Sequence, residues 1–188
     1  GYHGPMLRNA ILLGVIWLLA GCSSAVRLMP TPTLFTTDEP GAFTGVPTIA
    51  ESTEVEVFYA TNRFPVGPAD SRYYSRVRSN QMRVGVATLR IGDESKTVAA
   101  LRAMSTSAVE GTRPVLSLTE TREMAALDAS GRTLSGDLEA FIACLDQSLE
   151  RAGNRELLIY VHGANTDFDR ATAQAAQFGH FMGRDAVV

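Results

Sequence analysis

The chain has 188 residues, of which 45% are hydrophobic and 20% are charged, a composition typical of one globular domain. Its formal net charge is -3, and the two signs are interspersed, so it has no basic stripe that would bind nucleic acid. The two cysteines, Cys22 and Cys144, are too few for a disulfide-stapled scaffold or a cysteine-rich zinc site. The three histidines show no metal-ligand spacing, so we expect neither a metal nor a cofactor.

The N-terminus has the pattern of an export signal. Residues 6–9 carry one positive charge, residues 10–20 are wholly apolar, and small residues follow. The apolar run is shorter than the ~20 residues that a membrane-spanning helix needs. Residues 1–5 precede the expected start at Met6, and we interpret them as upstream translation or a gene-prediction artefact.

The signal ends in Leu19-Ala20-Gly21-Cys22, which resembles the lipobox of bacterial lipoproteins. This resemblance implies that Cys22 is acylated and becomes the first mature residue. Ser23 in the next position implies anchoring to the outer membrane, facing the periplasm. The alternative is ordinary cleavage nearby, with Cys22 unmodified. Residues 23–52 are rich in Pro, Thr, Ser and Gly and predict a flexible tether.

The first half of the folded part predicts strands and one helix. Strands are expected over residues 55–59 and 82–91, with a polar loop between them, and a weaker strand over 114–118. Apolar residues at helical spacing follow over 138–149. Ser135 or Asp137 is expected to cap this helix at its start, and Gly153 at its end.

The second half predicts a strand, a tight turn, a helix and a further strand. Residues 157–161 are continuously apolar, as in a parallel strand covered on both faces. After the turn at 162–165, Thr166 and Asp169 predict a capping box. The expected apolar face of this helix consists of Phe168, Ala171, Ala175, Phe178 and Met182. Gly183 is expected to end the helix, and residues 186–188 to open another strand, which together indicate an α/β fold.

The turn His162-Gly163-Ala164-Asn165 is the candidate site, because α/β proteins place their sites at the carboxyl ends of strands. Gly163 would allow close approach of the backbone, and the N–H of Ala164 could face a developing negative charge. The alternative is a turn that merely ends the strand, with His162 packed against neighbouring loops.

The remaining candidate residues are expected to be structural. Asp128, Asp137 and Asp146 fall in a turn or on a solvated helix face, and Asp167 and Asp169 suit a helix N-terminus. Cys144 is expected to be a small buried hydrophobe, and His180 lies within a helix. For Arg63 the sequence offers no physical role.

Four segments resemble a bacterial family of α/β-hydrolase-like proteins of unknown function, several of which carry lipoprotein signals. The segments are 157–178 (LLIYVHGANTDFDRATAQAAQF), 57–63 (VFYATNR), 85–87 and 116–118, so the resemblance covers the chain from about Glu54 to Val188. One departure is Ala164, where an aromatic residue would be expected. The backbone N–H survives this change, but an apolar wall of an acyl pocket could be lost.

The resemblance implies an α/β-hydrolase fold with a Ser, acid and His triad, in which the serine sits in a Gly-x-Ser-x-Gly elbow. The sequence contains no such elbow, and His162 precedes any serine that could take this role. We therefore expect residues 53–188 to be the N-terminal part of such a domain, with an incomplete sheet and no activity of its own. The expected parent is an exported, lipid-anchored serine hydrolase acting on a small-molecule ester or acyl substrate. The alternatives are a non-catalytic envelope protein that binds through the same fold and the product of a truncated gene.

Overall fold

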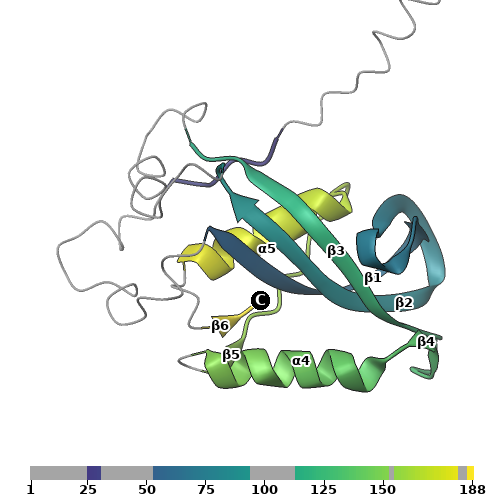
Figure 1. Ribbon diagram of the computed structural model, residues 1–188. Coiled ribbons are helices and arrows are strands. Elements are labelled where there is room, and N and C mark those ends of the chain that lie inside the picture. The colour runs from purple at the N-terminus through teal and green to yellow at the C-terminus, as the bar shows by residue number, and fades with distance from the viewer. Residues whose placement is uncertain (1–24, 31–52, 94–112, 153–154, 182–185) are drawn as a thin grey trace, which may run out of the picture.

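The computed structural model describes residues 25–30, 53–93, 113–152, 155–181 and 186–188 (Figure 1). Four predictions lie outside the described residues: the signal with Cys22, the helix ends at Gly153 and Gly183, and Met182 on a helix face. Within the described ranges, no helix is long and apolar enough to cross a membrane.

Four antiparallel strands form the main sheet in chain order. They are β1 (Glu54–Val66), β2 (Tyr73–Ile91), β3 (Leu116–Leu127) and β4 (Thr133–Gly136). A short 3-10 helix, η2 (Ala69–Ser71), lies between β1 and β2. The three strands predicted for the first half of the folded part are present as β1, β2 and β3, although their bounds differ.

The polar loop predicted between residues 59 and 82 is wrong, because β1 and β2 continue as a long hairpin. Arg63 pairs with Arg78 and Val66 with Tyr73, with register shifts around Arg63. We predicted strands from their apolar residues. A hairpin that is exposed to solvent is held together by backbone hydrogen bonds between its strands, so its polar side chains do not indicate a strand. For the same reason β3 runs well past residue 118, and β4 was not predicted.

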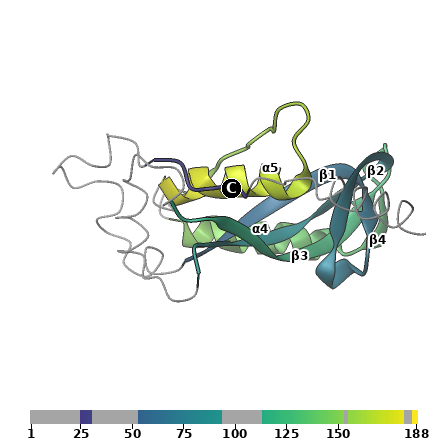
Figure 2. The same ribbon diagram turned by 90° about the horizontal axis from the view of Figure 1, so that it is seen from above.

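The two helices cover opposite faces of the sheet, giving three layers (Figure 2). Helix α4 (Leu138–Arg151) is capped by Asp137, whose carboxylate accepts a hydrogen bond from Ala140 N at 2.9 Å. Of the two predicted capping residues, Ser135 and Asp137, the structure therefore has Asp137. Helix α5 (Phe168–Phe181) begins at Asp167, whose carboxylate accepts from Arg170 N at 2.9 Å. The predicted capping box is therefore wrong: the capping residue is Asp167, one position after Thr166.

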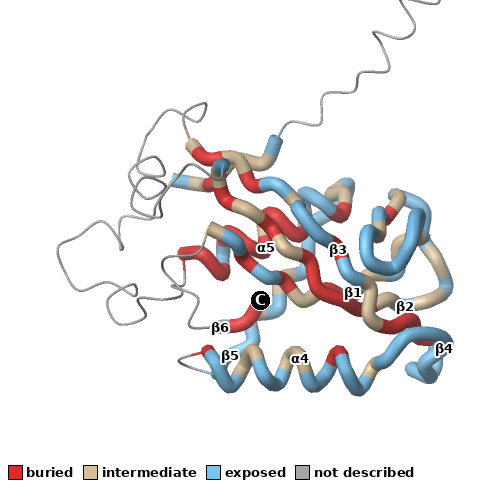
Figure 3. Tube along the Cα trace, viewed as in Figure 1, coloured by how far each residue is buried: buried red, intermediate tan, exposed pale blue. Residues whose placement is uncertain are grey.

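The larger core lies between α5 and the sheet (Figure 3). Ala173 and Ala176 are buried and let the helix approach the strands closely. The rings of Tyr59, Tyr74 and Phe168 form a cluster with centroids 4.7–5.5 Å apart. The predicted apolar face of α5 is only partly right, because Phe178 is 40% exposed.

A short parallel pair joins the free edge of β1. Strand β5 (Glu156–Leu157) pairs in parallel with β6 (Ala186–Val187), and Phe58 N donates to Val188 O at 2.8 Å. The chain is thus a mixed α/β protein in which an antiparallel sheet adjoins a parallel β–α–β unit. This confirms the α/β class and the strand predicted over 186–188.

The strand predicted over residues 157–161 is confirmed only at its start. Leu158 N donates to Val187 O at 2.7 Å, but β6 offers no partner beyond that point. Leu158 and Tyr160 pack against the core, whereas Ile159 and Val161 are 77% and 83% exposed. The predicted coverage on both faces is therefore wrong, since the described residues cover one face only.

Residues 25–30 depart from the flexible tether predicted over residues 23–52. Leu28 is fully buried, and Leu116 N donates to Val26 O at 2.8 Å. Met29 N donates to the Gln177 side chain at 2.6 Å. The segment adds a short pairing beside β3, so the folded unit begins earlier than residue 53.

Candidate functional site

The predicted turn follows the β5 segment, which consists of β5 and the extended residues 158–161, and lies directly before α5 (Figure 1). Residues 162–165 are exposed, and Asn165 adopts the left-handed conformation with φ 58°. Asparagine tolerates this conformation better than most residues. Among the described residues, none accepts a hydrogen bond from the backbone N–H groups of 163–165. These donors are therefore available to a ligand.

Gly163 is not required by backbone conformation or by packing. Its φ lies outside the left-handed region, and a Cβ built there would have no described heavy atom within 4 Å. The space beside the turn is therefore open. A ligand could occupy the space beside Gly163 without displacing a described side chain.

Arg63 has a role that the sequence did not suggest. Its guanidinium donates to the carbonyl oxygen of Thr166, just before α5, and to that of Ser75 on β2 at 3.4 Å. Because one planar group bonds to both segments, it ties the end of the turn to the β1–β2 hairpin. Arg63 is thus a positioning residue for the turn.

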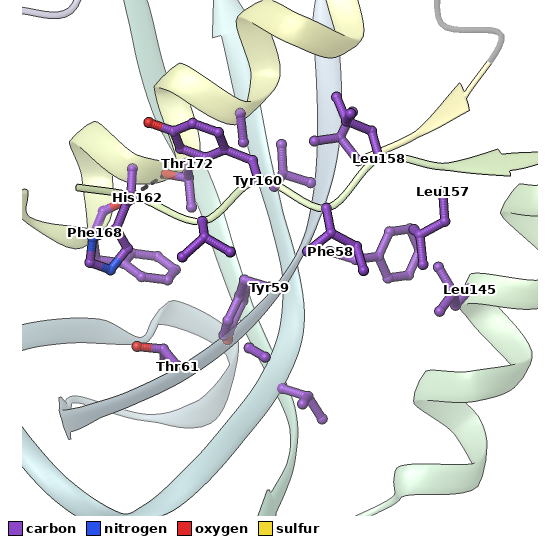
Figure 4. A pocket seen from close by; sticks show the side chains of 18 of the residues that line it. Phe58, Tyr59, Thr61, Leu145, Leu157, Leu158, Tyr160, His162, Phe168 and Thr172 are labelled. Carbon is purple, nitrogen blue, oxygen red and sulfur yellow. Dashed lines mark hydrogen bonds between the residues drawn. The ribbon is translucent and has the colours of Figure 1, made fainter.

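An apolar cavity of about 490 Å³ lies next to the turn (Figure 4). Residues of β1, the β5 segment, α4 and α5 line it. In Figure 4, Phe58, Leu145 and Leu157 lie toward one end, and Tyr59, Phe168 and His162 toward the other. The cavity is large enough for a small acyl group, and His162 places the turn at its rim.

A second, polar cavity of about 310 Å³ adjoins the first. Three arginines, Arg63, Arg76 and Arg78, line it together with residues 162–166, and no carboxylate is among its described lining residues. The two cavities share Ala60, Thr61, Arg63 and His162. The turn therefore borders an apolar space on one side and a cationic space on the other.

A buried ionic cluster supports the cavity wall from behind. Glu123 is only 6% exposed, and Arg83 Nη1 donates to its Oε1 at 2.9 Å. Arg72 Nη2 donates to Oε1 at 3.2 Å, and Arg72 Nε lies 3.1 Å from Oε2 without hydrogen-bond geometry. Tyr74 donates to Oε2 at 2.8 Å, and its hydroxyl lies 3.0 Å from that of Tyr59. The cluster thus fixes Tyr59, which lines the apolar cavity.

Burial keeps both phenols of this cluster protonated. It raises the pKa of Tyr59 to about 12, with the carboxylate of Glu123 adding to the shift. Burial and the hydrogen bond to Tyr59 raise the pKa of Tyr74 well above its ordinary value of 10.0. Neither group can act as a base at neutral pH, so their role is to hold the sheet and the cavity wall.

No hydroxyl or thiol group of the described residues is hydrogen-bonded to the His162 ring. Threonines line the two cavities, but none of their described lining residues is a serine or cysteine. His162 Nδ1 lies 2.9 Å from the carbonyl oxygen of Gly163, a contact within the turn itself. His162 is exposed, so it does not pack against neighbouring loops as the alternative interpretation expected.

The predicted aspartates lie apart and have separate roles. Asp128 accepts from Ser130 and Arg132 in the β3–β4 turn, and these bonds lower the pKa of its carboxyl. Asp137 caps α4, and Asp146 is exposed on that helix. In the first turn of α5, burial and the neighbouring Asp167 raise the pKa of Asp169.

Cys144 and His180, the other two residues predicted to be structural, lie on the two helices. Cys144 is half-buried on α4 rather than fully buried. His180 is buried on α5, with its ring centroid 5.1 Å from that of Phe181. Within the described part of the chain, no three His, Cys, Asp or Glu side chains are grouped where they could hold a metal ion.

Sequence reasoning missed Arg76, Arg78 and Glu123. Arg76 and Arg78 lay in the segment interpreted as a loop, although Tyr74, Arg76 and Arg78 recur every second residue. This period would have indicated a strand with one basic face. Glu123 had no such signal, because its partners come from a different strand.

Comparison with protein-family models, curated proteins and solved structures finds no match to this chain. The site is therefore interpreted from its own geometry and from the sequence motifs.

Proposed function

We propose that the turn 162–165 is the oxyanion turn of an exported serine hydrolase of the esterase or lipase type. The observation that carries this proposal is the set of unpartnered, exposed backbone N–H groups beside an apolar cavity of about 490 Å³. Such a cavity would hold the acyl chain while an N–H donor faces the carbonyl oxygen of the ester. Anchoring through an acylated Cys22 is part of the same proposal.

The chemistry needs a donor that is fixed before the reaction begins. In the tetrahedral intermediate the carbonyl oxygen becomes an oxyanion, and one preorganised donor stabilises the transition state by about 3–4 kcal/mol. Arg63 helps to fix the turn, since its guanidinium bonds to the carbonyl oxygen of Thr166.

The fold is compatible with this proposal. The turn joins a parallel strand to a helix within a β–α–β unit, where α/β-hydrolases place one of their oxyanion donors. The nucleophile, acid and base must come from outside these 188 residues, because the sequence contains no Gly-x-Ser-x-Gly elbow. The chain by itself is then expected to be inactive.

The second candidate is a lipid-anchored envelope protein that binds an apolar ligand without catalysis. The described residues that line the two cavities include no serine or cysteine, which favours this candidate. The two proposals differ in whether the bound acyl group is cleaved.

The test is ester hydrolysis by the product of the complete reading frame that contains this sequence. Ala164→Pro removes the N–H, and we expect kcat for a short-chain aryl ester to fall about 10²–10³-fold with little change in KM. The control Ala164→Gly keeps the N–H and is expected to remain near wild type. Thermal unfolding of all three proteins checks that the proline variant folds.

Equal activity of a folded Ala164→Pro variant and wild type would overturn the oxyanion role. Saturable binding of the ester without any hydrolysis would favour the binding protein instead.

A further inference from the structure

We propose that the polar cavity binds an oxyanion, a carboxylate or phosphate, carried by an amphiphilic acyl substrate whose chain lies in the apolar cavity. The identification of this ligand as a substrate rests on the proposed function. Binding of the ligand does not require that it be hydrolysed. It assigns to Arg76 and Arg78 a role that no motif indicated.

The charge of the cavity is unbalanced. Arg63, Arg76 and Arg78 line a space of about 310 Å³, and no described acidic side chain lines it with them, although Asp167 pairs with Arg76 at 3.4 Å. Guanidinium groups sharing one cavity repel one another, and a bound anion would relieve this repulsion. Arginine is also suited to the task, because its planar fork matches carboxylate and phosphate oxygens.

Two of the three arginines can turn to a ligand at little cost. The Arg78 side chain makes no hydrogen bond or ion pair with any described residue. Arg76 pairs with Asp167 at 3.4 Å, but the two side chains are 70% and 37% exposed, so this pair contributes little stability. Arg63 is engaged with two carbonyl groups and sets the position of the turn instead.

The junction of the two cavities defines the class of ligand. They meet at Thr61, Arg63 and His162, so one molecule can occupy both. An apolar chain would lie between Phe58, Leu145 and Leu157 (Figure 4). Its anionic end would lie among the arginines of the polar cavity. A neutral ester of the same length would fill only the apolar part.

Calorimetric titration of the full chain with octanoate, 1-octanol and inorganic phosphate tests this inference. We expect octanoate to bind about tenfold more tightly than octanol, because only octanoate carries the charge. Octanoate should also bind more tightly than phosphate, which uses the polar cavity alone. Arg78→Gln should reduce octanoate affinity to nearly that of octanol, and it should leave octanol binding unchanged.

The matched control is Arg122→Gln, which makes the same charge change at an exposed position of β3 that lines neither cavity. Equal affinity for octanoate and octanol, or equal losses in the two variants, would overturn the inference. Phosphate binding more tightly than octanoate would keep an anion site but refute the amphiphilic ligand. Failure of ester hydrolysis would refute only the proposed function.

Discussion

The Glu123 cluster should contribute far more stability than ion pairs on the surface of the same sheet. Glu123 is 6% exposed and balances Arg72 and Arg83, which are 16% and 13% exposed. Glu123→Gln would leave two buried guanidinium groups without a countercharge. Breaking a buried pair in this way typically costs about 3–5 kcal/mol of unfolding free energy.

Arg72→Gln provides an internal comparison. This change leaves Arg83 and Glu123 as a balanced pair at 2.9 Å, so its cost should be smaller than that of Glu123→Gln. Glu54→Gln is the surface control, because its pair with Arg90 joins side chains that are 46% and 28% exposed. Such exposed pairs contribute about 0–1 kcal/mol.

Urea unfolding of the full chain, followed by circular dichroism, measures all three variants. The expected order of destabilisation is Glu54→Gln, then Arg72→Gln, then Glu123→Gln. If Glu123→Gln is too unstable to fold, its complete loss of the unfolding transition agrees with the prediction. The reasoning is refuted if Glu123→Gln and Glu54→Gln cost the same, or if Arg72→Gln costs more than Glu123→Gln.

Three further predictions concern packing, pH and the exposed strand. A Cβ on Gly85 would lie 2.1 Å from Arg122 O and 2.6 Å from Tyr59 Oη, so Gly85→Ala should cost about 1–3 kcal/mol in urea unfolding, whereas Gly163→Ala should cost almost nothing. The folded-state pKa of Asp169 lies above its ordinary value of 3.8, so ionisation of this carboxyl destabilises the folded protein. The unfolding free energy of wild type should therefore fall relative to that of Asp169→Asn as pH rises from about 4 to 7. A difference in unfolding free energy that does not change with pH would contradict this. The double variant Ile159→Lys/Val161→Lys should aggregate less than wild type in light scattering. Its unfolding free energy should change by less than about 0.5 kcal/mol, because both side chains are about 80% exposed. Leu158→Lys, which alters a side chain packed on the core, should destabilise instead.

The sequence predicted the elements that have strong local signals. Asp137 and the periodic apolar residues after it define α4, and the β-branched residues at 55–59 define the start of β1. The turn 162–165 was also placed correctly, because it separates a strand from an Ala-rich helix.

The rest depends on contacts between distant segments. The cationic cavity brings Arg76 and Arg78 of the hairpin to a turn about 90 residues away, which no local pattern reveals. Leu28 is buried because its neighbours pair with residues 114–116, although its own surroundings in the sequence predict a tether. The continuous apolar run over residues 157–161 predicted coverage on both faces, yet Ile159 and Val161 are exposed, because coverage depends on segments distant in the sequence.

The most direct test of the proposed hydrolase is covalent labelling of its nucleophile. The product of the complete reading frame would be treated with a fluorophosphonate, and the labelled residue would be identified by mass spectrometry. We predict one labelled serine in a Gly-x-Ser-x-Gly elbow outside residues 1–188, with labelling slowed by Ala164→Pro but not by Ala164→Gly. No labelling of the folded protein, or labelling that Ala164→Pro leaves unchanged, would contradict the assignment of the turn at 162–165 as an oxyanion site.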